Sequence, residues 1–211
     1  MKILLRLMVL AFVFAVMLTA CGGGGDSSGG HTQTVTSGGT ATKQIGTSSD
    51  DYGYAVAVDT SGNVYVTVAT YGSLDGNTSA GVSDIFLVKY NATGTKQWTR
   101  QLGTSSNDYG YAVTVDTNGN IYVTGDTNGS MDGNTSAGGS DMFIVKYDST
   151  GVKQWTRQLG TVADDYGWGV AVDASENVYV TGATNGNLDG NTSAGYSDIF
   201  LVKYNSSGVK Q

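Results

Sequence analysis

The sequence of 211 residues contains no proline, one cysteine and one histidine, and charged residues make up only 14% of it. A lone cysteine cannot build a disulfide framework, and a zinc site would lack its usual cysteine and histidine ligands. The histidine, His31, lies in a glycine- and serine-rich segment, where no partner would position it for catalysis. The composition therefore argues against thiol, zinc and histidine-dependent catalysis.

Basic residues are scarce as well, with 11 Lys and Arg against 18 Asp and Glu, and the formal net charge is −7. Nucleic-acid partners require a basic surface, because contacts with phosphates supply much of the affinity. We therefore expect no nucleic-acid partner. Glycine, by contrast, is abundant, with 32 residues. This composition is typical of a loop-rich all-β domain rather than of a helical enzyme.

The first 41 residues divide into two segments. Residues 1–20 predict a secretory signal, because Lys2 and Arg6 precede the apolar run LMVLAFVFAVMLTA, which is too short to span a bilayer as a stable helix. Residues 21–41 contain the run GGGGDSSGGHTQTVTSGGT, which predicts a flexible tether with a reach of roughly 20 to 25 Å.

The signal ends in LTAC, Leu18 to Cys21, which resembles the lipobox of bacterial lipoproteins. The resemblance implies cleavage before Cys21 and a lipid on this cysteine that anchors the chain to a membrane. Gly22 stands where an Asp retains some lipoproteins at the inner membrane, so we expect the outer membrane or the cell surface. An ordinary signal peptide with an unpaired cysteine nearby is the alternative interpretation.

Near-copies of one unit begin at Tyr52, Tyr109 and Tyr166, which gives a repeat of 57 residues. A fixed period of this size indicates a solenoid or a propeller. Runs rich in β-branched and aromatic residues in the second unit predict four strands, at 111–116, 121–126, 141–147 and 152–159. The turns DTNG and DSTG place glycine where a positive φ is needed, so the strands are expected to form antiparallel hairpins. Each unit is therefore predicted to be one propeller blade.

The repeat also resembles a known family. The pattern DYGYAVAVDTSGNVYVTVAT, followed by SDIFLVKYNATGTKQW, is similar to the SBBP repeat, a bacterial β-propeller repeat of secreted and surface lipoproteins. The resemblance extends from Thr42 to Gln211. It implies an all-β fold of propeller blades and a surface location, and it carries over no catalytic residues. The three units are expected at about 42–98, 99–155 and 156–211.

Three blades are fewer than a propeller ring normally needs, and the third unit lacks its last predicted strand. Three interpretations stay open: a truncated gene product, a ring closed by two or more copies of the chain, and a stable open stack. The segment ATKQIGT, Ala41 to Thr47, matches WTRQLGT at 98–104 and 155–161. It could supply the missing strand to the third blade or to another chain, and symmetric closure would cover strand edges that favour aggregation.

The motif DGNTSAG returns in a long loop of every unit. In a four-stranded meander this loop shares a face with the linker between units, where most acidic residues gather, so this face is expected to bind ligands. Alternating oxygen-bearing side chains and a closing Asp predict a calcium site in each loop. The predicted ligands are Asp75, Asn77, Asp84, Asp132, Asn134, Asp141, Asp189, Asn191 and Asp198. Alternatively, these side chains cap backbone groups in Asx-turns, and recent duplication explains the sameness.

Trp98 and Trp155 are expected to pack between blades rather than to stack on a ligand. No carboxylate pair stands out for a glycosidase, and the only glutamate, Glu176, replaces a hairpin glycine.

The leading hypothesis is a non-catalytic binding or scaffolding propeller for a protein or glycan, with Tyr71 and Tyr196 exposed in its loops. A calcium-stabilised structural surface element is the second hypothesis, and a propeller glycosidase is the third.

Overall fold

The computed structural model describes residues 42–211, and the predictions for the signal segment 1–20, for Cys21 and for the tether up to residue 41 lie outside them. The strands are β1 (Asp51–Val58), β2 (Val64–Thr70), β3 (Asp84–Tyr90), β4 (Lys96–Leu102), β5 (Asp108–Val115), β6 (Ile121–Thr127), β7 (Asp141–Tyr147), β8 (Lys153–Leu159), β9 (Asp165–Val172), β10 (Val178–Thr184) and β11 (Asp198–Tyr204). Two short 3-10 helices are η1 (Met131–Gly133) and η2 (Leu188–Gly190). None of the helices in this part of the chain is long and apolar enough to cross a membrane.

The strands form three antiparallel meanders of consecutive strands, which confirms the predicted all-β fold of propeller blades. The first sheet contains β1 to β4, the second β5 to β8, and the third β9 to β11. A bridge between Tyr204 and Lys210 lies where the other blades begin their fourth strand. The boundary expected at 98/99 falls inside β4, because this strand continues to Leu102 before the linker to the second blade.

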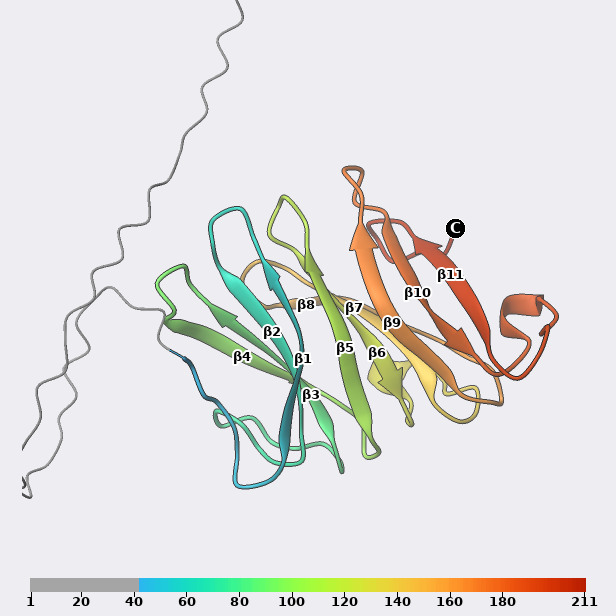
Figure 1. The fold of residues 1–211 in the computed structure, drawn as a ribbon, viewed down its shortest axis with the longest axis horizontal. Coiled ribbons are helices and arrows are strands. Elements are labelled where there is room, and N and C mark those ends of the chain that lie inside the picture. Colours follow the sequence, from blue (N-terminus) through green and yellow to red (C-terminus); the bar gives the residue numbers. More distant parts are fainter. Residues whose placement is uncertain (1–41) are drawn as a thin grey trace, which may run out of the picture. The chain divides into compact units, whose positions relative to one another are not determined.

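The three sheets are stacked in an open row in Figure 1, with β1, β5 and β9 side by side. These first strands contact one another from blade to blade. Within residues 42–211 the sheets do not close into a ring, and the first and third blades occupy its two ends.

One carboxylate organises each hairpin turn that follows a first strand. In the second blade, the Asp116 carboxylate accepts hydrogen bonds from the backbone N–H groups of Asn118 and Asn120, both at 2.9 Å. It also accepts one from the Tyr122 hydroxyl at 3.0 Å. Gly119 has a φ of 81°, which confirms the predicted role of glycine in this turn. Asp59 and Asp173 accept the equivalent hydrogen bonds in the first and third blades. The aspartate therefore fixes the backbone of each turn, in a sequence that has no proline to do so.

Each junction between blades is one apolar core. We call the side of a sheet toward the following blade its trailing face, and the side toward the preceding blade its leading face. The first junction buries Tyr65, Ile85, Leu87 and Leu102 of the trailing face against Ile121, Val123, Met131, Phe143, Val145 and Tyr147 of the leading face. The second junction buries Tyr122, Met142, Ile144, Val178, Val180, Val202 and Tyr204. Because strand side chains alternate, neighbouring residues of β7 supply both junctions.

The two tryptophans expected between blades stand at these junctions. Trp98 packs against the first core and Trp155 against the second. The Arg100 guanidinium lies 5.2 Å from the centre of the Trp98 ring, and its Nε donates to the Gly151 carbonyl of the next blade at 2.7 Å. The equivalent arginine and glycine repeat this arrangement at Trp155. Each tryptophan thus contacts a glycine turn of the following blade.

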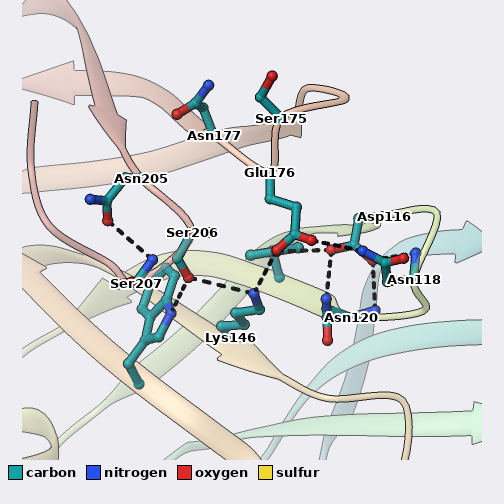
Figure 2. A network of polar contacts seen from close by, with 12 residues as sticks. Asp116, Asn118, Asn120, Lys146, Ser175, Glu176, Asn177, Asn205, Ser206 and Ser207 are labelled. Carbon is teal, nitrogen blue, oxygen red and sulfur yellow. Dashed lines mark hydrogen bonds and ion pairs between the residues drawn. The ribbon is translucent and has the colours of Figure 1, made fainter.

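A polar network joins the second and third blades at the hairpin-turn side of the junction (Figure 2). Glu176 has a φ of 61° where the other blades have glycine, and its carboxylate accepts from Asn118 Nδ2 at 2.7 Å and from Lys146 Nζ at 3.5 Å. Lys146 also donates to the Ser206 carbonyl at 3.5 Å, and Trp155 Nε1 donates to the same carbonyl at 3.1 Å. The contacts offset part of the cost of placing a side chain at a positive φ.

Replacing Gly151 by alanine tests the contact between tryptophan and glycine, with Gly133→Ala as the matched control. Both glycines have a positive φ, 80° and 78°, but only a Cβ at Gly151 would meet the Trp98 ring, at 3.0 Å. We expect Gly133→Ala to cost about 1 kcal/mol of unfolding free energy through backbone strain. We expect Gly151→Ala to cost about 1 kcal/mol more, because the ring must move. Urea unfolding measures both, and equal losses would contradict the contact.

Candidate functional site

The predicted calcium ligands of the long loops contact other groups of the protein. The first ligand of each loop is an aspartate with a left-handed backbone: Asp75, Asp132 and Asp189. Each of these carboxylates forms an ion pair with a lysine 21 residues later, and the first two also accept from a threonine hydroxyl. The second ligand is an asparagine whose side chain donates to a carbonyl of its own loop: Asn77, Asn134 and Asn191.

The closing aspartate of each loop folds the loop back on itself. Its carboxylate accepts a backbone N–H from four residues earlier, at 2.7 to 2.8 Å, in Asp84, Asp141 and Asp198. In the described part of the chain, no three His, Cys, Asp or Glu side chains gather into a group that could hold a metal. The asparagines and the closing aspartates contact backbone groups of their own loops, whereas the first aspartates pair with side chains, and calcium binding stays a prediction.

The long loops lie beside the linkers between blades, as expected for a meander. The backbone N–H of Val82 donates to the Ser106 carbonyl at 3.3 Å, and that of Asp108 donates to the Ser83 carbonyl at 2.9 Å. Tyr196, two residues before β11, is fully exposed, and Tyr71 is exposed as well. The hydroxyl of Tyr71 lies 3.2 Å from that of Tyr109, which belongs to a first strand. A tyrosine that follows β2 thus contacts the aromatic residues of a first strand, which form a surface of their own.

This surface, which we call the tyrosine row, consists of two aromatic residues from each first strand. Its members are Tyr52, Tyr54, Tyr109, Tyr111, Tyr166 and Trp168. Tyr109 and Tyr111 are stacked with ring centres 6.1 Å apart, and Tyr54 meets Tyr111 edge to face at 5.3 Å across the first junction. The two aromatic rings of the third blade are stacked at 6.1 Å.

The local backbone explains why six aromatic residues share one surface. In each first strand the register skips the second aromatic residue, so that Tyr54, Tyr111 and Trp168 are bulged. In the second and third blades the glycine between the aromatic pair faces the preceding blade: a Cβ at Gly110 would lie 2.9 Å from Ile85. Glycine thus permits close packing on one side, and the aromatic rings occupy the other.

Among the described residues, Asp126 is the buried carboxylate beside the tyrosine row that has no counterpart in the other two blades. It lies in β6 opposite Tyr109, is only 2% exposed, and its Oδ1 has no hydrogen-bond partner among the described residues. The other two blades have Ala69 and Ala183 at this position. A buried carboxylate without full hydrogen bonding costs stability, so its presence in one blade marks a candidate functional residue.

Burial controls protonation in this site. Desolvation raises the pKa of the Asp126 carboxyl to about 6, and the polar side chains of Tyr111 and Ser140 oppose the rise only in part. The hydrogen bond with Tyr71 and burial raise the pKa of Tyr109 to about 12, and burial with Asp126 nearby raises that of Tyr111 further. The tyrosine hydroxyls therefore stay protonated at neutral pH. They can donate and accept hydrogen bonds but supply no phenolate nucleophile.

Sequence reasoning used the tyrosines to find the repeat but did not assign them a binding role. Two signals were present: aromatic residues on both sides of a glycine at Gly53, Gly110 and Gly167, and one aspartate in place of alanine. The bulge that aligns the rings could not be read from the pattern. The conspicuous loops drew the prediction toward Tyr71 and Tyr196 instead.

We expect Asp126→Ala to change how stability depends on pH. A raised pKa means that the folded protein binds the proton more tightly, so the contribution of Asp126 is fully present below pH 3.8 and is lost as pH rises through about 6. The wild type should lose about 3 kcal/mol of unfolding free energy from this group over that range, and the variant should not. Denaturant unfolding from pH 4 to 8 measures both. Parallel pH curves would contradict the buried state of Asp126.

Comparison with known proteins identifies the repeat. A family model described as a β-propeller repeat, SBBP, matches residues 42–74, 97–130 and 154–189. An uncharacterized WD repeat-containing protein of Acanthamoeba polyphaga mimivirus is 30% identical over 159 residues, which cover 62% of this chain and 11% of that protein. The regulatory protein FlaEY of Caulobacter vibrioides is 27% identical over 167 residues, covering 71% of this chain and 18% of that protein.

This chain thus spans less than a fifth of the length of either relative. Each match of the family model covers the first two strands of one blade, together with β4, β8 or the segment that precedes β1. Sequence, topology and family model agree on the same unit. The three repeats of this chain match the SBBP β-propeller repeat.

Proposed function

We propose that the protein is a non-catalytic binding module that a lipid on Cys21 holds at the outer membrane or cell surface. Its ligand is a glycan, bound on the tyrosine row; a protein ligand is the alternative. The observation that carries the proposal is the row itself, in which Tyr52, Tyr54 and Trp168 are exposed although they belong to ordered strands. Exposed aromatic residues on rigid elements are typical of binding surfaces.

The chemistry of the row favours a sugar. Its rings offer apolar faces for stacking, while the Tyr71 and Tyr109 hydroxyls offer polar atoms beside them. An acidic chain with a net charge of −7 disfavours polyanions. A neutral, hydroxyl-rich ligand fits this combination.

Several considerations support a binding rather than an enzymatic role. One relative is named as a WD repeat-containing protein and the other as a regulatory protein, and neither name describes an enzyme. A glycosidase needs two positioned carboxylates of different protonation. Asp164, the acidic neighbour of Asp126, accepts the Ser140 backbone N–H at 2.9 Å, as a structural side chain does.

Binding to a glycan microarray tests the proposal, followed by calorimetry with the strongest oligosaccharide. We expect Tyr54→Ala and Trp168→Ala each to weaken binding roughly ten- to a hundredfold, because each removes an exposed stacking surface of the tyrosine row. Tyr196→Ala is the matched control, since Tyr196 is a fully exposed tyrosine outside the row. Its affinity should equal that of the wild type. Equal loss in all three variants, or no glycan bound by the wild type, would refute the site.

Labelling of cells with a radioactive fatty acid tests the anchor separately. We expect the wild type to take up label and to sediment with membranes, whereas Cys21→Ala should take up none and should appear in the soluble fraction. Ser27→Ala, a change in the segment that follows, serves as the control and should behave as the wild type. Membrane association of Cys21→Ala without label would show that the lipid is not the anchor.

A further inference from the structure

Two apolar surfaces remain uncovered at the ends of the row of blades. On the trailing face of the third blade, Ile199 is 91% and Leu201 is 72% exposed. The same positions of the second blade, Met142 and Ile144, are fully buried beneath the third blade. A hollow of about 650 Å³ lies at the open β11 edge of this blade, where Ile199 and Leu201 line it together with Leu188 and Lys210. This surface therefore has the composition of a blade junction but has no blade against it in residues 42–211.

The opposite end of the row carries the complementary surface. On the leading face of the first blade, Val56 and Val58 of β1 are exposed. Their equivalents in β5, Val113 and Val115, pack against the core of the first junction. The chain thus presents, at its two ends, the two faces that already meet twice within it.

We propose that these end faces bind each other between two copies of this chain, head to tail, so that two copies close one six-bladed ring. Six blades lie within the four to eight that closed propellers have. The contact joins different surfaces of the two copies, and such contacts end in a ring only when the rotation closes. Two equal junctions would remove all four exposed end faces at once.

The segment that precedes β1 packs on the first blade as the fourth strand of a preceding blade would. Ile45 packs against Val68, Leu74 and Phe86 of the first blade. In the next junction, Leu102 of β4 takes the corresponding place against the second blade. Residues 42–47 thus occupy the position of a fourth strand that belongs to a preceding blade. In the proposed ring this segment would continue the strand that begins at the bridge beside β11.

A lysine at the uncovered end matches those that hold the internal junctions. Lys203 lies 5.6 Å from the centre of the Tyr179 ring, as Lys89 does from its own tyrosine ring at 5.2 Å. Lys89 donates to the Ser149 carbonyl of the following blade at 3.0 Å. Counting by repeats, the carbonyl that Lys203 would reach is that of Ala92 in the second copy.

Gly53 offers a sharp test, because it is unconstrained in the single chain. A Cβ at the equivalent Gly110 would lie 2.9 Å from Ile85, and one at Gly167 would lie 2.4 Å from the Thr124 hydroxyl of the preceding blade. Gly53 has nothing within 4 Å. Closure by a second copy would place Thr181 of that copy against Gly53. A methyl group there should leave the single chain unchanged and obstruct the ring.

Native mass spectrometry of the full chain, released from a mild detergent, tests the ring. We expect two copies for the wild type and mainly one copy for Gly53→Ala, with a dissociation constant raised at least tenfold. Leu201→Glu should raise it at least a hundredfold, because it buries an unpaired charge. The controls are Gly195→Ala, which also has open space around it, and Val162→Glu, at an exposed linker residue; both should keep two copies.

Thermal unfolding at concentrations where single copies dominate should show that Gly53→Ala and Gly195→Ala fold equally well. A wild type that remains a single copy at micromolar concentration would overturn the proposal. So would two copies that persist in both Gly53→Ala and Leu201→Glu, since association would then use another surface. A ladder of larger species would show that the contact does not close.

Discussion

The junction between neighbouring sheets is the constraint on which the rest of the structure depends. A single four-stranded sheet with apolar side chains on both faces cannot be stable in water, and only stacking on another sheet buries those faces. Met142 and Phe143 illustrate this, because adjacent residues of one strand serve opposite junctions. The polar contacts of Arg100 and Lys146 then fix how each blade is rotated on the next. Stability in this fold is therefore a property of pairs of blades rather than of single repeats.

The repeat, the strands and the hairpin turns could be predicted because their determinants are local. Gly119 is required by its own turn, and the continuous apolar run MFIV of β7 is typical of a strand covered on both faces. The tyrosine row could not be predicted, since it depends on a register skip at Tyr111 and on the approach of another blade to Gly110. The protonation of Asp126 likewise follows from burial that the third blade helps to provide. Features that depend on contacts between two blades cannot be predicted from the sequence of a single repeat.

The site that results combines rigid and responsive parts. The rings are held by strands and by each other, so little conformational freedom is lost when a ligand covers them. Asp126 differs, because a carboxyl with a pKa of about 6 changes charge in the range of mildly acidic surroundings. Because Asp126 is buried, this change of charge occurs inside the sheet beside the rings rather than on the exposed surface. The aspartate at a position where the other blades have alanine thus makes the second blade the one whose charge beside the rings depends on pH.

Near-identical repeats also pose a problem of assembly, and Glu176 bears on it. Three blades with almost the same faces can pair in the wrong order while the chain folds, because apolar surfaces alone do not distinguish one neighbour from another. Glu176 is matched to Lys146 and Asn118 of the second blade, and the first and second blades carry glycine at its position. Lys89 and Lys203 repeat Lys146, but serine stands at the position of Asn118 in the other two blades, so only the second blade offers Glu176 this amide contact. Glu176, which strains its own turn, thus distinguishes the junction between the second and third blades from the junction between the first and second.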